Sequence, residues 1–240
     1  MFGVYRISKF CNGLLKALAS EGTAMMDGIN ANAKVDVPVV VCVGDSITFG
    51  DTGLGYRAEH PWPEQLDALL GVNAVNCGHN GAASADYPSM DEFLLAKRHM
   101  PQAAALLVGL GVNDVAHDFV TSVGQVPEAL ARVKALIDDL RSEARPSLEV
   151  CLLSVPQLSL DDPIMSRFGY QGLARMNPLL ADLDHCYREA CPDLGWHYID
   201  YAPVINGHRE LHGDSIHPNQ LGYDSIAVRI AALLKPILGK

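Results

Sequence analysis

The chain has 240 residues, of which 49% are hydrophobic and 19% charged, so it has enough apolar material for a sizeable core and too little charge for a disordered chain. Its formal net charge of −10 argues against a nucleic-acid partner, because binding to a phosphate backbone depends on clustered Lys and Arg. No stretch approaches the roughly 20 apolar residues of a membrane span, and no Pro/Ser-rich linker divides the chain.

The first 35 residues are predicted to be a helical extension ahead of a main domain at residues 36–240. Apolar residues form a loose stripe at helical spacing here: Leu14, Leu15, Leu18, Met25 and Met26. Residues 1–19 also resemble a signal peptide ending in Ala-Leu-Ala, but Lys16 interrupts the apolar region and leaves it too short. We therefore expect an amphipathic leading helix and a cytoplasmic protein rather than a secreted one.

The remaining sequence alternates between short apolar runs and helical patterns. Strands are predicted at Val39–Val43, Ala74–Cys77, Ala103–Gly109, Leu148–Val155 and His197–Ile199. Helices are predicted at Pro61–Leu70, Ser89–His99, Glu128–Glu143, Leu173–Ala190 and Leu221–Leu234. This alternation predicts parallel βαβ units and an α/β fold, a three-layer α/β/α sandwich around a five-stranded parallel sheet of flavodoxin-like order 2-1-3-4-5.

Polar and glycine-rich segments follow four of these predicted strands. They are Gly44-Asp45-Ser46, Asn76–Ser84, Gly111–Asp114 and Asn206–Asn219. In an open parallel sheet the carboxyl ends of the strands meet at one edge, where ligands bind, so we expect these segments to share a site. A Gly-Asp-Ser turn can also simply cap the next helix, so the interpretation of Ser46 depends on its neighbours.

Ser46 is a candidate nucleophile if a base is available to take its proton and a third group orients that base. Asp214-Ser-Ile-His217 offers both, because a separation of three residues lets the two side chains project from one turn. Asp214 would contact one ring nitrogen of His217, and Ser46 the other. Asp214 could instead cap the last helix.

Donors for an oxyanion are also present. The N–H groups of Ser46 and Gly81 and the side-chain amide of Asn113 could converge on one oxygen atom. Asp45 and Asp114 stand beside these positions, and we expect each to hold its own turn by side-chain to backbone hydrogen bonds.

Together these segments resemble the four blocks of the SGNH hydrolases, also called the GDSL family of lipases and esterases. The matching blocks are Gly44-Asp45-Ser46, Asn76-x-Gly78-x-x-Gly81, Gly111-x-Asn113-Asp114 and Asp214-x-x-His217-Pro218. The resemblance implies the sandwich fold and a serine ester hydrolase that needs no cofactor and no metal. Its roles would fall to Ser46 as nucleophile, His217 as base and Asp214 as orienter, with Ser46, Gly81 and Asn113 forming the oxyanion hole.

The substrate is expected to be a small-molecule or carbohydrate ester with a short acyl group. Few large apolar side chains stand near the serine, and the residues expected to touch substrate are polar or aromatic: Asp45, Phe49, Tyr56, His79 and Asn80. The amino-acid sequences of the serine and histidine blocks also resemble those of the carbohydrate O-acetylesterase branch of the family. The loop from Pro156 to Tyr170 could instead supply an apolar wall, which would favour a longer-chain lipase or lysophospholipase.

Three other functions remain open from the residues alone. An acyltransferase would use the same triad with an acceptor hydroxyl in place of water. A metal-binding protein could use a histidine cluster, His208, His212, Asp214 and His217, although its spacing fits no common zinc motif. An inactive binding module could also retain the fold.

Overall fold

In the computed structural model, which describes residues 37–160 and 169–240, the apolar runs form a five-stranded parallel sheet. The strands are β1 (Val39–Gly44), β2 (Asn73–Gly78), β3 (Ala103–Gly109), β4 (Glu149–Leu153) and β5 (His197–Ile199). Their order is β2-β1-β3-β4-β5, which confirms the flavodoxin-like prediction. β1 is buried along its whole length, as its run of apolar and mostly β-branched residues predicts for a central strand.

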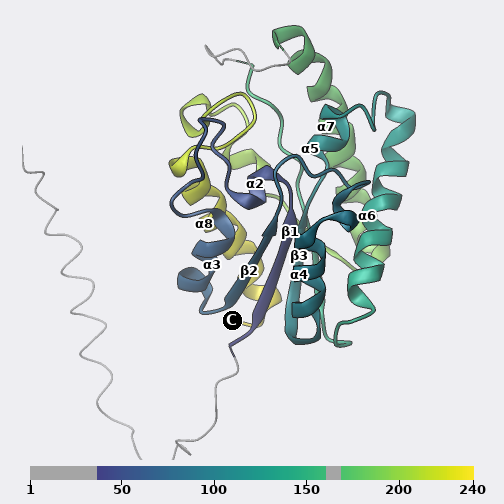
Figure 1. The fold of residues 1–240 in the computed structure, drawn as a ribbon, viewed down its shortest axis with the longest axis vertical. Helices are drawn as coiled ribbons and strands as arrows, with labels where there is room; N and C mark the ends of the chain where they lie inside the picture. The colour runs from purple at the N-terminus through teal and green to yellow at the C-terminus, as the bar shows by residue number, and fades with distance from the viewer. Residues whose placement is uncertain (1–36, 161–168) are drawn as a thin grey trace, which may run out of the picture. The chain divides into compact units, whose positions relative to one another are not determined.

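Helices cover both faces of this sheet (Figure 1). The α-helices are α2 (Ser46–Phe49), α3 (Trp62–Leu70), α4 (Asp91–His99), α5 (Val112–Ala116), α6 (Val126–Arg141), α7 (Gly169–Leu194) and α8 (Gln220–Ile237). Short 3₁₀ turns lie at η1 (Tyr87–Ser89), η2 (Met100–Gln102), η3 (Val123–Gln125), η4 (Ala202–Val204) and η5 (Arg209–Leu211). Helices α3 and α8 pack together on one face, and α4, α6 and α7 lie on the other, so the three-layer α/β/α sandwich is confirmed.

The predicted elements differ from the observed ones mainly at their ends. Helix α7 begins at Gly169, and it continues through Pro178 and ends only at Leu194, beyond both predicted limits. The four-residue α2 and five-residue α5 were not predicted as helices, because each is a single turn that directly follows a strand. Within the described ranges, no helix is long and apolar enough to cross a membrane.

Some predictions concern residues that the structure does not describe. The helical extension predicted for residues 1–35 lies outside the described residues. So do residues 161–168, the centre of the predicted Pro156 to Tyr170 loop. The described residues belong to one unit, Val37–Lys240, in which buried side chains from the sheet and from both helical layers form a single core.

Candidate active site

Three glycines end the first three strands side by side. Gly44 pairs in register with Gly78 on β2 and with Gly109 on β3. A Cβ atom on Gly78 would lie 2.1 Å from the backbone nitrogen of Phe49, and one on Gly44 would lie 2.1 Å from Oγ1 of Thr48. The row of glycines therefore lets the short helix α2 sit directly on the carboxyl edge of the sheet, at the point where strand order reverses.

Ser46 is the first residue of that helix, and only 6% of it is exposed. Asp45 caps the helix by accepting a hydrogen bond from the backbone N–H of Ile47 at 2.9 Å. The N–H of Ser46 has no intrahelical acceptor, as is general for the first turn of a helix. This leaves a backbone donor beside the serine hydroxyl.

The structure brings Ser46, His217 and Asp214 together. Nε2 of His217 lies 2.9 Å from Oγ of Ser46, although 171 positions separate them in the sequence. On the other side of the ring, Nδ1 lies 2.9 Å from Oδ2 of Asp214. Asp214 does not cap the last helix, since Asn219 does so by accepting from the N–H of Gly222. The three side chains therefore form a continuous line of hydrogen-bonding contacts.

The two carboxylate oxygens of Asp214 both contact the imidazole, and one of them also fixes the turn. Oδ1 accepts the backbone N–H groups of Ile216 at 2.7 Å and His217 at 2.6 Å, which fixes the turn. Oδ2 makes the shorter contact with the imidazole. A single turn thus sets both the position of the histidine and the tautomer that exposes Nε2 to the serine.

The charges of this pair shift both pKa values. Burial works to lower the pKa of His217, but the hydrogen bond and charge of Asp214, with the charge of Asp51, raise it above its ordinary value. Burial works to raise the pKa of Asp214, yet its bonds and charge contact with His217 lower it overall. The arrangement therefore favours a carboxylate beside a histidine that readily accepts a proton.

Gly81 and Asn113 come from the loops after β2 and β3, and a hydrogen bond joins the two loops. Nδ2 of Asn113 donates to the carbonyl of Ala82 at 3.0 Å, which uses one of its two amide hydrogens. Gly81 has a φ of +79°, a left-handed conformation that favours glycine. A second amide hydrogen on Asn113 remains for a ligand.

The expectation that the Asp114 side chain holds its own turn is wrong. Its fully buried carboxylate reaches the glycine loop, where it accepts the N–H of Ser84 at 2.9 Å and its hydroxyl at 2.5 Å. Nη2 of Arg132, on α6, donates to the same carboxylate at 3.0 Å, and its Nε donates to Oγ of Ser84. We call Ser84, Asp114 and Arg132 the loop clamp. It ties the Gly81 loop to α5, and sequence reasoning missed Ser84 and Arg132 because nothing local marks them.

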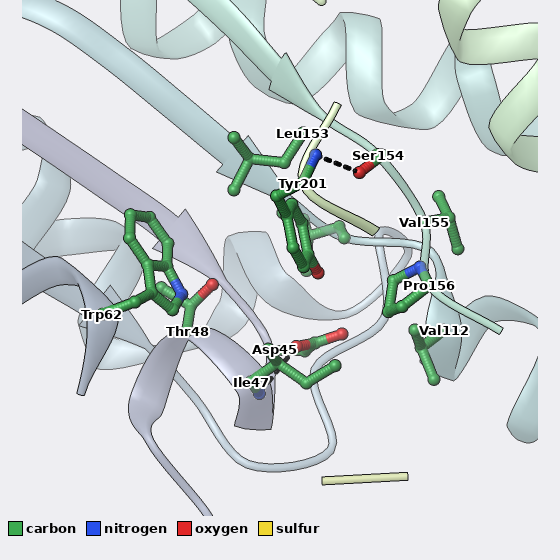
Figure 2. Close-up of a pocket in the computed structure, with 12 residues that line it drawn as sticks. Asp45, Ile47, Thr48, Trp62, Val112, Leu153, Ser154, Val155, Pro156 and Tyr201 are labelled. Carbon is green, nitrogen blue, oxygen red and sulfur yellow. Dashed lines mark hydrogen bonds between the residues drawn. The ribbon is translucent and has the colours of Figure 1, made fainter. Parts of the chain in front are cut away.

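Asp45 is buried and lines a small internal cavity. It is only 3% exposed and faces a cavity of about 10 Å³, enough for roughly one water molecule. Figure 2 shows this cavity between Asp45 and Thr48 on one side and Ser154 and Tyr201 on the other. Burial raises the pKa of Asp45 to about 7, against the opposing hydrogen bond from Ile47. This side chain faces the protein interior and offers almost no surface to a substrate.

The other predicted substrate residues lie in two loops. The ring of Phe49 packs under the guanidinium of Arg57, 5.2 Å from its centre, and Tyr56 is 60% exposed. In the glycine loop, Asn80 is exposed and Nδ1 of His79 lies 2.9 Å from Oε2 of Glu92. Tyr56 and Asn80 are therefore the two of these side chains most open to a ligand.

The histidine cluster is dispersed in the structure. Nδ1 of His208 pairs with Oε1 of Glu210, and Nε2 of His212 lies 3.1 Å from the carbonyl of Ile205. Among residues 37–160 and 169–240, no three His, Cys, Asp or Glu side chains are placed to hold a metal ion. His217 is engaged with Asp214 and Ser46 instead.

Comparison with known proteins gives a consistent result. The model of the GDSL-like lipase/acylhydrolase family matches residues 42–224. An acetylxylan esterase from Xylanibacter ruminicola is 26% identical over 213 residues, which cover 84% of this chain and 44% of that protein. The chain therefore spans less than half the length of this curated relative.

Two solved structures share the fold. A carbohydrate acetylesterase family member from Sinorhizobium meliloti superposes with a TM-score of 0.68 at 22% identity, covering 85% of this chain and 100% of that one. The aryl esterase of M. smegmatis has a TM-score of 0.65 at 15% identity, covering 83% and 99%. At these identities the likeness concerns the fold alone.

Proposed function

Because the chain belongs to the GDSL-like lipase/acylhydrolase family and is thereby a carboxylic ester hydrolase, we propose that it cleaves short-chain, acetyl-type esters of a carbohydrate with Ser46 as nucleophile. The observation that carries the proposal is the line of contacts from Ser46 through His217 to Asp214, with 2.9 Å at each of its two steps. A serine hydroxyl becomes an effective nucleophile when such a base accepts its proton.

In the first half of the reaction, Oγ of Ser46 attacks the ester carbonyl carbon and its proton passes to Nε2 of His217. Asp214 stabilises the imidazolium that forms, in keeping with the raised pKa of His217. When the tetrahedral intermediate collapses, the bond to the alcohol oxygen breaks and the alcohol leaves with the proton from His217. An acyl group remains on Ser46.

In the second half, His217 takes a proton from water, and the resulting hydroxide attacks the acyl carbon. The carboxylic acid leaves, and the proton returns to Ser46. In both halves the negative oxygen is stabilised by the N–H groups of Ser46 and Gly81 and by the free amide hydrogen of Asn113. Donors fixed in advance in this way are worth several kcal/mol to a transition state, about 2.7 to 4 for one donor.

The acetyl and carbohydrate parts of the proposal rest on two kinds of support. The acetylxylan esterase relative points to this substrate class by its name. The exposed Tyr56 ring offers a face on which a sugar can stack, and Asn80 and His79 offer hydrogen-bonding groups. A hydroxyl-rich alcohol suits such side chains better than a hydrocarbon chain does.

The test is hydrolysis of matched esters from acetyl to dodecanoyl, together with an acetylated oligosaccharide, by the wild type and Ser46→Ala. We expect kcat/KM to be highest for acetyl and the Ser46→Ala variant to be inactive while still folded. A fluorophosphonate should label the wild type on Ser46.

Three results would redirect the proposal. A rate that rises steadily with chain length would favour the longer-chain lipase reading, and a product ester formed when an alcohol is added would favour the acyltransferase. Full activity in Ser46→Ala would remove the serine mechanism altogether.

A further inference from the structure

The loop at residues 51–57, which we call the support loop, is held rigidly beside the turn that carries Asp214 and His217. Asp51 and Arg57 form an isolated bridge, and the hydroxyl of Thr52 donates to the carbonyl of Tyr56 at 2.6 Å. The N–H of Gly53 donates to Oδ1 of Asp51, and the hydroxyl of Tyr223 on α8 donates to the Asp51 carbonyl. These bonds fix the loop at both ends, so its tip has little freedom to move away.

Within this loop, Gly53 presses directly against the carboxylate of Asp214. A Cβ atom on Gly53 would lie 2.1 Å from Oδ2, 2.2 Å from Cγ and 2.9 Å from Cβ of Asp214. The opposite loop also has a glycine at the contact. A Cβ atom on Gly213, which precedes Asp214, would lie 2.0 Å from the carbonyl oxygen of Thr52. The two backbones approach this closely only because both positions lack a side chain.

Asp214 cannot shift to make room without losing its function. Its Oδ1 holds the backbone N–H groups of Ile216 and His217, and its Oδ2 holds Nδ1 of the imidazole. Oδ2, the atom that a side chain at position 53 would meet first, makes the shorter of the two contacts with Nδ1 of His217, at 2.9 Å against 3.1 Å for Oδ1. A movement of the carboxylate that relieves the clash changes the position of this oxygen relative to the ring.

From this contact we propose that Gly53 is a positioning residue, whose bare backbone seats the Asp214 carboxylate against His217. The role rests on the proposed function of the triad, but the contact itself is a property of the fold. Gly53 acts through Asp214 and needs no contact with the substrate.

The chain supplies a matched control in Gly55. Gly53 and Gly55 have similar positive φ values, +72° and +84°, but a Cβ atom on Gly55 would meet nothing within 4 Å. Alanine at either position therefore incurs the same kind of backbone strain, and only Gly53→Ala displaces Asp214. We expect Gly53→Ala to lower kcat at least about tenfold more than Gly55→Ala does, and by no more than the roughly 10⁴-fold that follows loss of a triad acid's function.

A second measurement follows the histidine without relying on activity. The groups facing His217 are Asp214 on its own turn, Asp51 on the support loop, and Asp45 and Ser46 at the start of α2. Moving Asp214 away weakens the main attraction for the imidazolium, so NMR titration should show a lower His217 pKa in Gly53→Ala and none of this fall in Gly55→Ala. The acid limb of kcat/KM should move to lower pH with it.

The same substitutions in an Asp214→Ala background complete the test. There the two closest clashes are gone, so the extra effect of Gly53→Ala over Gly55→Ala should largely disappear. If Gly53→Ala alone does not fold, recovery of folded protein in the double variant supports the role, and continued failure contradicts it.

Equal losses in the two glycine variants, with an unchanged His217 pKa, would overturn the positioning role. Failure of the proposed function is distinguishable, since it would show as hydrolysis that survives in Ser46→Ala.

Discussion

Removing the carboxylate of Asp114 should destabilise the protein strongly, because it leaves the partly buried charge of Arg132 without its carboxylate partner. Asp114 is fully buried and accepts three hydrogen bonds, from two donors of Ser84 and from Arg132. Breaking a buried ion pair from one side costs about 3 to 5 kcal/mol. The Arg132 side chain is 27% exposed and regains some hydration, so we expect the lower end for Asp114→Ala, about 3 kcal/mol.

Urea and thermal unfolding measure this cost. For a chain of this length, each 1 kcal/mol lowers Tm by about 2–4 °C, so a fall of roughly 6–12 °C is expected. The control is Asp138→Ala, which removes an exposed pair with Lys134 on the same helix as Arg132 and should change stability by about 0.5 kcal/mol or less. Replacing Asp114 and Arg132 together by apolar residues should recover much of the loss. A loss below about 1 kcal/mol in Asp114→Ala would refute the view that the clamp's buried charge pair is important to the fold.

Three further predictions concern the site. Asn113→Ala should lower kcat by about 10² to 10³ with little change in KM, as for loss of one oxyanion donor, whereas a raised KM at constant kcat would make Asn113 a ground-state binding residue. Because the pKa of His217 is raised and its neutral form is the base, kcat/KM should fall as pH drops through a value above the ordinary 6.5 or so of histidine; a midpoint below that value would contradict the assigned charges. Asp45 keeps its proton in the fold up to about pH 7 while an unfolded chain releases it near pH 4, so wild-type stability should decline across that range. Measured by urea unfolding, the free energy of unfolding of Asp45→Asn relative to that of the wild type should increase from pH 4 to pH 7. A relative value that stays constant with pH would count against a buried, neutral Asp45.

The sheet could be predicted because its signals are local. The run Val39–Val43 is apolar and largely β-branched, which favours a strand buried on both faces, and the alternation of such runs with helical patterns leaves few topologies. Helix ends were less predictable. Gly71 ends α3 in a left-handed conformation as expected, but α7 begins at Gly169 and ends at Leu194, beyond the predicted limits Leu173 and Ala190.

In the candidate site, the identity of the residues could be predicted but the direction of their side chains could not. Ser46, His217 and Asp214 could be nominated because each belongs to a short motif whose residue types suit one chemistry. Asp45 carries the same motif signal, yet the structure turns it inward, because a side chain's direction at a strand end depends on how the following helix packs. A motif therefore identifies which residues gather at the sheet edge, but it does not say which of them face a substrate.

The contacts that hold the motifs in place have no local signal at all. Gly53 meets Asp214, and Ser84 meets Asp114, across long stretches of sequence, and each contact exists only once the strand order has brought the loops together. The sequence alone does not distinguish a glycine in an open loop from a glycine packed against a carboxylate. Gly53 and Gly55 illustrate this, since they share a loop and a backbone conformation and differ only in what lies beyond the missing side chain. The chemistry of such a site can thus be read from its motifs, while the precision of that chemistry depends on packing that only the folded chain reveals.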